Sequence, residues 1–147
     1  PNARQDERAP ADVFTWRPRP LGWGAYGEVV AAIHKATKAR RAVKCVSKTK
    51  LKKLHKDNVA KYVMREADIL RQMDHPNIVR LYQVFESPTN FYLVMEQCNG
   101  GNLLDHVNKA NGALTEAEAA SFLWQILSAL LHIHNRGFVH RDVKPEN

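Results

Sequence analysis

Three glycines near the start of the sequence have the spacing of a phosphate-binding loop. The segment from Gly22 to Val29 fits the pattern G-x-G-x-x-G-x-V, and glycines let backbone N–H groups approach phosphate oxygens without obstruction by a Cβ. Dinucleotide-binding folds use similar glycines, but there they open a helix, and a carboxylate follows about 20 residues later. Here Ser47 stands at that distance, and the β-branched residues after Gly27 favour a strand. Taken alone, the pattern fits an ordinary glycine turn better than a phosphate site.

Two charged residues in apolar surroundings form a second candidate. Lys44 lies in the alternating segment 41–47, RAVKCVS, which is typical of a half-buried strand. Glu66 follows Val63 by three residues and precedes Leu70 by four, so it belongs to the apolar stripe of a predicted helix. Because a charge is costly to bury alone, each requires a partner of opposite sign. We predict an ion pair between Lys44 and Glu66, the alternative being that Glu66 lies in water at the edge of the stripe.

The last eight residues, HRDVKPEN, carry the most specific pattern. They match the catalytic loop of protein kinases at seven positions, with Val143 in place of the usual Leu, and they follow a capped amphipathic helix, as that loop requires. From about Phe14 to Asn147 the chain therefore resembles the protein kinase family. Lys144, two residues after Asp142, is typical of serine/threonine kinases.

The resemblance implies a role for each charged or polar residue. Asp142 would accept the proton of the substrate hydroxyl, and Lys144 would stabilise negative charge on the transferring phosphoryl group. Lys44, paired with Glu66, would hold the α- and β-phosphates of ATP, and Asn147 would hold Mg²⁺. The implied function is transfer of the ATP γ-phosphoryl group to serine or threonine hydroxyls of a protein substrate. A non-catalytic nucleotide-binding or scaffolding protein is the alternative.

The same resemblance assigns the nucleotide pocket. The glycine positions would approach the phosphates and Tyr26 would cover them, while three apolar residues would form the roof over adenine: Leu21, Val29 and Ala42. Met95 takes the position before the hinge, and the backbone of Glu96 and Cys98 would bond the adenine edge. The glycines concerned are Gly22, Gly24 and Gly27.

Three longer stretches are similar to calcium-dependent and calmodulin-dependent kinases: GAYGEVV, READILRQMDHPNIVRLYQVFE and YLVMEQCNGGNLLDHV. This similarity implies regulation by calcium and calmodulin, or by EF-hands, in a part of the protein outside this sequence. The D-F-G metal-binding segment and the activation loop would also lie beyond Asn147. Asn102 departs from the family, because many kinases that prefer basic substrates carry a Glu there, and Trp23 is unusual between the first two glycines.

These motifs need an α+β fold to position them. The resemblance implies a kinase-like N-lobe, a five-stranded antiparallel sheet plus one helix, followed by the first helices of the helical C-lobe of an incomplete domain. We expect a flexible tail over residues 1–12, the N-lobe and hinge over 13–98, and the start of the C-lobe, which stops within the catalytic loop, over 99–147. Expected helices cover 57–73, 102–108 and 116–136, with a capping box at Thr115 and Glu118.

Composition narrows the class of protein. Of the net charge of +7, the segment 48–65 supplies seven cations and one anion, with Tyr62 as its only aromatic residue. Because nucleic-acid surfaces usually interleave aromatic residues with cations, we expect a solvated basic face and no nucleic-acid partner. No stretch is long and apolar enough to suggest a membrane partner. Two cysteines give no disulfide framework, which favours a cytoplasmic or nuclear protein with reduced thiols.

Overall fold

The computed structural model of the chain describes residues 4–6, 9–24, 26–54 and 59–146. They form two compact units. The first comprises Pro1–Gln72 and Val79–Gln97, and the second comprises Met73–Ile78 and Cys98–Asn147. A single boundary was expected after Cys98; the two units meet between Gln97 and Cys98, and the segment 73–78 belongs to the second unit.

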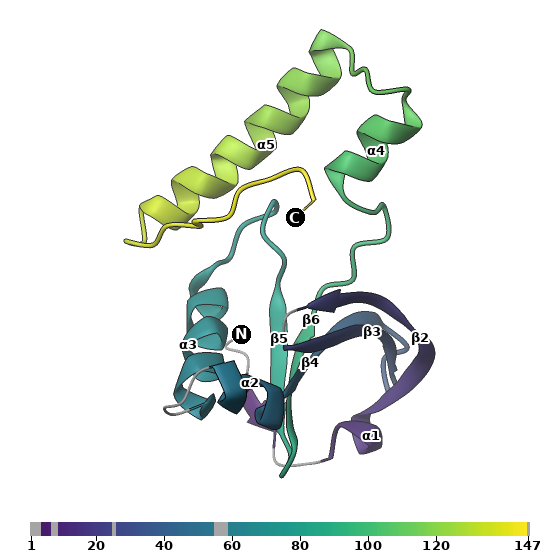
Figure 1. The fold of residues 1–147 in the computed structure, drawn as a ribbon, viewed down its shortest axis with the longest axis vertical. Coiled ribbons are helices and arrows are strands. Elements are labelled where there is room, and N and C mark those ends of the chain that lie inside the picture. Colours follow the sequence, from purple (N-terminus) through teal and green to yellow (C-terminus); the bar gives the residue numbers. More distant parts are fainter. Residues whose placement is uncertain (1–3, 7–8, 25, 55–58, 147) are drawn as a thin grey trace. The chain divides into compact units, whose positions relative to one another are not determined.

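A six-stranded sheet in the order β1-β5-β6-β4-β3-β2 forms the centre of the first unit (Figure 1). Five of the strands pair antiparallel, in agreement with the prediction. The strands are β1 (Arg4–Asp6), β2 (Phe14–Gly24), β3 (Gly27–His34), β4 (Arg40–Ser47), β5 (Leu81–Glu86) and β6 (Asn90–Met95). The sixth strand, β1, pairs parallel with β5.

The described residues 4–6 and 9–12 differ from the flexible tail expected over residues 1–12. Arg4–Asp6 lies alongside Gln83–Phe85, and Pro10–Val13 forms the short helix α1 with Pro10 and Val13 buried. The physical reason is that β5 would otherwise be an edge strand whose backbone groups have no sheet partner on one side. A polar strand can supply those hydrogen bonds without showing any apolar pattern in its sequence.

Strand β2 lies at the opposite edge of the sheet. Pro18 and Pro20 within it cannot donate a backbone hydrogen bond, which is tolerated on an edge strand. The pairing of β2 with β3 shifts between Trp16 and Pro20 and again between Pro20 and Gly22.

Two helices pack on one face of the sheet, α2 (Lys48–Leu54) and α3 (Val59–Gln72) (Figure 1). Their buried residues Leu51, Val63 and Ala67 form one core cluster with strand residues Val46, Leu81, Val84, Phe91 and Leu93. Helix α3 was predicted over 57–73, of which residues 57 and 58 lie outside the described residues. Helix α2 was not predicted, so together with α1 the described part of the first unit has three helices where one was expected. The other face carries a second cluster, which comprises Val13, Phe14, Val30, Ala32, Val43, Phe85 and Val94.

The second unit contains α4 (Leu103–Lys109) and α5 (Glu116–His134). The predicted capping box is present, because the Glu118 N–H donates to Thr115 Oγ1 at 3.2 Å and the Thr115 N–H donates to Glu118 Oε2 at 2.9 Å. Helix α5 ends at His134, and Gly137, three residues later, has a φ of +77°, the left-handed conformation common after a helix end.

The segment 73–78 is fixed to α5 by side-chain contacts. His75 Nε2 lies 3.1 Å from Ser128 Oγ, and Asn77 Nδ2 donates to Gln125 Oε1 at 3.2 Å. The rings of His75 and His132 have centroids 4.9 Å apart. These contacts explain why the segment belongs to the second unit. Among the described residues, no helix has both the length and the apolar character needed to cross a membrane.

Candidate functional site

The predicted ion pair between Lys44 and Glu66 is present. Lys44 Nζ on β4 lies 2.6 Å from Glu66 Oε1 on α3, and the two side chains retain exposed fractions of 29% and 36%. The pair is therefore partly buried and still reachable from solvent. Since each charge compensates the other, Lys44 is held at a fixed position on the sheet with its cation available to an anionic ligand.

The apolar residues predicted to form the nucleotide pocket share the face of the sheet on which Lys44 lies. Val29 is the cross-strand partner of Lys44, and Met95 is the partner of Ala42. Directly opposite residues of an antiparallel pair lie on the same face, as do residues two apart in one strand. Val29, Ala42 and Met95 thus surround Lys44. Leu21, on β2, is 51% exposed.

The glycine loop, residues 22–29, is the hairpin between β2 and β3. The three glycines differ in the space that a Cβ would have at each position. A Cβ added to Gly27 would overlap the backbone carbonyl oxygen of Cys45 on the neighbouring strand, whereas at Gly22 it would meet no atom within 4 Å, and at Gly24 it would lie 3.8 Å from the carbonyl of Gly27. Gly27 is therefore needed for strand packing, while the space beside Gly22 is open to a ligand.

Tyr26, at the tip of this loop, contacts helix α3. Its ring centroid lies 5.9 Å from that of Tyr62 in an edge-to-face arrangement, and it packs against the core cluster below α2 and α3. Its carbonyl oxygen accepts a hydrogen bond of 3.1 Å from the Ser47 N–H. The predicted covering of phosphates by Tyr26 remains a prediction; the contact with Tyr62 was not predicted.

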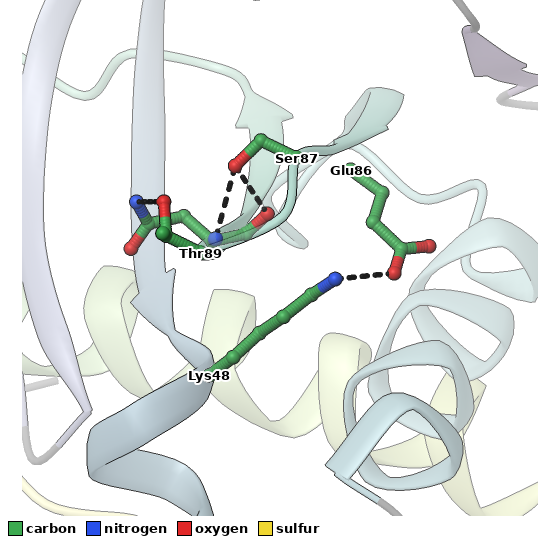
Figure 2. Close-up of polar contacts among 5 residues, drawn as sticks. Lys48, Glu86, Ser87 and Thr89 are labelled. Carbon is green, nitrogen blue, oxygen red and sulfur yellow. Dashed lines mark hydrogen bonds and ion pairs between the residues drawn. The ribbon is translucent and has the colours of Figure 1, made fainter.

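A second ion pair in the same unit has the same length but a different setting. Lys48 Nζ lies 2.6 Å from Glu86 Oε1, as Figure 2 shows, with exposed fractions of 26% and 38%. The Lys48 N–H also donates to the Thr89 carbonyl at 2.9 Å, and its ammonium lies 4.7 Å from the centre of the Phe91 ring. One cation of the basic segment 48–65 is therefore used to fasten α2 to the β5–β6 turn.

The predicted hinge begins at Glu96. Its N–H donates to the Arg80 carbonyl at 2.9 Å, and the Arg80 N–H donates to Glu96 Oε2 at 3.4 Å. With its N–H used in this way, Glu96 can offer adenine only its carbonyl oxygen. Cys98, whose backbone was predicted to make the second contact, is exposed and is the first residue of the second unit after the hinge.

The catalytic-loop residues lie in the second unit. Lys144 Nζ is 2.8 Å from Asp142 Oδ2, and this hydrogen bond, together with the negative charge of Asp142, raises the pKa of Lys144. The Asp142 N–H donates to His140 Nδ1 at 3.3 Å, and Arg141 has a φ of +68°. The loop is tied to α4 by a hydrogen bond of 3.0 Å from the Leu104 N–H to the Pro145 carbonyl. The structure thus brings Asp142 and Lys144 together.

Asn102 has a local role that the sequence analysis missed. Its Oδ1 accepts a hydrogen bond of 2.7 Å from the Asp105 N–H, which makes Asn102 the N-cap of α4. Asn is among the best capping residues, so its place as the first residue of the predicted helix 102–108 was the available signal. The Glu found there in many kinases would be a poorer cap.

The described residues contain no cluster of three or more His, Cys, Asp or Glu placed to hold a metal ion. Asn147, the predicted Mg²⁺ ligand, lies outside them.

Comparison with known proteins gives consistent matches. Residues 17–147 match the family described as the protein kinase domain. The chain is 44% identical over 137 residues to calcium-dependent protein kinase 5 of Plasmodium falciparum, covering 93% of this chain and 23% of the relative. It is 41% identical over 127 residues to myosin light chain kinase A of Dictyostelium discoideum, covering 86% and 41%. The chain thus spans about a quarter to two fifths of these relatives.

A solved structure is also similar. The crystal structure of Rad53 residues 1–466 in complex with AMP-PNP matches with a TM-score of 0.83 and 38% sequence identity, covering 92% of this chain and 34% of that chain.

Proposed function

Because the chain belongs to the protein kinase family, we propose that it forms the ATP-binding part and the start of the catalytic loop of a serine/threonine kinase. The proposed reaction transfers the ATP γ-phosphoryl group to a serine or threonine hydroxyl of a protein. The observation that best supports this proposal is the ion pair of 2.6 Å between Lys44 and Glu66. It presents a fixed cation on the face of the sheet that also carries Val29 and Ala42. The AMP-PNP named with the similar Rad53 structure supports the nucleotide assignment.

The residues of this chain would act mainly by positioning and by charge. Lys44 would bind the α- and β-phosphates, and the open space beside Gly22 allows the backbone of the loop to approach them. Asp142 would accept the proton of the substrate hydroxyl as that oxygen attacks the γ-phosphorus and the bond to the β–γ bridging oxygen breaks. Lys144, 2.8 Å from Asp142, would stabilise the charge on the transferring group.

Mg²⁺ belongs to the proposal through the family. When bound with ATP it neutralises part of the phosphate charge. In this chain Asn147 would contribute its amide oxygen, and the remaining ligands would come from the D-F-G segment and the phosphates.

Regulation by calcium, a protein substrate and a cytoplasmic or nuclear location are further parts of the proposal. Regulation by calcium is supported by the name of the Plasmodium relative, a calcium-dependent protein kinase. The proposed location is supported by the free thiols of Cys45 and Cys98.

The test uses the full-length protein that contains this chain. We expect Asp142→Asn to lower kcat for phosphorylation of a protein substrate by at least about 100-fold, with ATP affinity changed less than about threefold, because the role of Asp142 belongs to the transition state. Asp68→Asn, an exposed carboxylate on α3 that pairs with Arg71, is the matched control and should retain activity. Turnover that survives Asp142→Asn would contradict the proposal, and ATP binding without any turnover in the wild type would favour the non-catalytic alternative.

A further inference from the structure

Two tyrosines connect the glycine loop to helix α3. Tyr26 follows the turn of the β2–β3 hairpin, and Tyr62 lies in the first turns of α3. Their rings meet edge to face at 5.9 Å, with planes at 66°. Edge-to-face contact places the positive edge of one ring against the negative face of the other, which makes it a directional contact as well as an apolar one.

The tyrosine contact is supported by two further interactions at the loop tip. Side-chain hydrogen bonding with Tyr26 is the largest cause that raises the pKa of Tyr62, followed by burial and by the charges of Tyr26 and Glu66. The backbone of Tyr26 is bonded to Ser47 at the end of β4. The loop tip is thus held by its backbone to the sheet and by its side chain to α3.

Tyr62, which makes the contact with Tyr26, lies near Glu66 of the Lys44–Glu66 ion pair on α3. The two residues are four apart in α3, so their side chains lie on one face of the helix, one turn from each other. Glu66 in turn is bonded to Lys44 at 2.6 Å. The contact with the loop tip and the ion pair with Lys44 are therefore made by side chains one turn apart on the same face of α3.

We propose that Tyr62 is a positioning residue for the nucleotide site, which holds the glycine loop to α3 through Tyr26 and so couples the loop to the Lys44–Glu66 pair. Two groups that would contact the phosphates, the loop backbone and the Lys44 ammonium, then take their positions from the same helix. A displacement of α3 would disturb both together. The effect on phosphates rests on the proposed function, whereas the effect on the loop does not.

The first experiment needs no nucleotide. Hydrogen exchange of the amides of residues 22–29 is followed in the full-length protein without ATP. Tyr62→Ala should accelerate exchange there about five- to tenfold, the size expected for loss of one aromatic pair. Tyr62→Phe, which keeps the ring and loses the hydroxyl, should accelerate it less. Tyr82→Phe is the matched control, because Tyr82 is a tyrosine of the same unit whose ring lies under Arg41 on β4, away from the loop.

The second experiment compares KM with kcat. Tyr62→Ala should raise KM for ATP about fivefold with kcat within about twofold, and Tyr26→Ala should raise it similarly. The double variant should be no worse than Tyr26→Ala alone, because Tyr62 acts on the loop through Tyr26. Tyr62 is 41% exposed, so its loss should leave the melting temperature nearly unchanged.

Different outcomes would contradict the positioning role of Tyr62 and the proposed function in ATP binding. Unchanged exchange in residues 22–29 of Tyr62→Ala would overturn the positioning role, whatever the kinetics show. Normal ATP binding by Tyr62→Ala would also overturn it. The same holds if the effects of Tyr62→Ala and Tyr26→Ala on KM multiply in the double variant. A wild-type protein that binds no ATP would defeat the proposed function, and the exchange experiment alone would then decide whether Tyr62 positions the loop.

Discussion

The two units of this chain differ in how they accommodate apolar side chains. Among the described residues, every buried apolar residue except Met73 lies in the first unit, where two clusters fill the two faces of the sheet. In the second unit, none of the described residues of α4 or α5 is buried. Large side chains of α5 are instead more than half exposed, namely Leu123, Trp124, Leu127 and Leu131.

The difference shows where the stability of this chain resides. The alternating strands place apolar residues on both faces of one sheet, and α2 and α3 cover one of them, so the first unit closes a core of its own. The apolar residues of α5 extend over more than one side of the helix and find no cover in the described part of the chain. An apolar surface of this kind favours association. Folding free energy should therefore come mainly from the first unit.

The largest effect expected from this comparison is on unfolding. Phe91 is 1% exposed in the first unit and Leu127 is 61% exposed in the second. In residues 1–147, Phe91→Ala should lower the free energy of unfolding by about 3–5 kcal/mol, whereas Leu127→Ala should change it by less than about 0.5 kcal/mol. Denaturant titrations of the two variants check this. Equal losses would mean that α5 is packed as tightly as the sheet.

The two cysteines allow a chemical version of the same comparison. Burial, together with the nearby carboxylate of Glu28, raises the pKa of Cys45 to about 11, while Cys98 is exposed. Because the thiolate is the reactive form, maleimide at pH 7.5 should label Cys98 readily and Cys45 at least about 100-fold more slowly than an ordinary thiol. Both should react alike in denaturant. Rapid labelling of Cys45 in the folded protein would show that the first unit opens easily.

Sequence patterns predicted most of the positions that regular periodicity or a local motif specifies. The strands around Lys44, the capping box at Thr115 and the ion pair to Glu66 all follow from alternation, helical spacing or a residue type in an unusual environment. The charge pairing could be foreseen because a lone charge on an apolar stripe must be compensated.

The missed features have no such local signal. Strand β1 is polar and owes its existence to the free edge of β5. Helix α2, KTKLKKL, has one buried residue, Leu51, among those whose burial is described, and lysines at its N-terminal end, where the helix dipole disfavours cations. The contact of Tyr26 with Tyr62 joins residues far apart in sequence, so only the folded chain reveals it.

A smaller effect concerns two glycines of one loop. A Cβ at Gly27 would overlap the Cys45 carbonyl, and a Cβ at Gly22 would meet open space. We expect Gly27→Ala to lower the free energy of unfolding by about 1–3 kcal/mol, as overpacking does, and Gly22→Ala to change it by less than about 0.5 kcal/mol. Thermal unfolding of both variants measures the difference. A Gly27→Ala variant as stable as Gly22→Ala would show that β3 and β4 can separate locally at no cost.

The smallest predicted effect is on the pH dependence of the second unit. His75 Nδ1 accepts the Asn77 N–H at 3.1 Å, and the Arg136 guanidinium donates to His132 Nδ1 at 3.2 Å. Burial, then the charges of Arg136 and His75, lowers the pKa of His132, with Asp74 opposing. A pKa below the unfolded value, about 6.5, means that this stability is present above that pH and is lost as pH falls through the folded-state pKa.

We therefore expect a fall in melting temperature between pH 7.5 and pH 5 that is reduced in His132→Phe, which keeps an aromatic ring but cannot be protonated. His134→Phe, an exposed position on the same helix, is the control and should behave as wild type. An identical pH dependence of the melting temperature in wild type and His132→Phe would show that protonation of His132 is not its cause.

The central claim is that Lys44 is a functional cation and not merely one half of a structural ion pair. The chain contains its own control, since Lys48 forms a pair of the same length, 2.6 Å, and of similar exposure with Glu86. The most direct test measures phosphoryl transfer from Mg²⁺-ATP to a protein substrate by the full-length protein and its Lys44→Met and Lys48→Met variants. We predict a loss of at least about 100-fold in kcat/KM for Lys44→Met, about 2.7 kcal/mol of transition-state stabilisation, and a change of less than about threefold for Lys48→Met. Equal effects of the two substitutions, or Lys44→Met activity within a few-fold of wild type, would contradict the account.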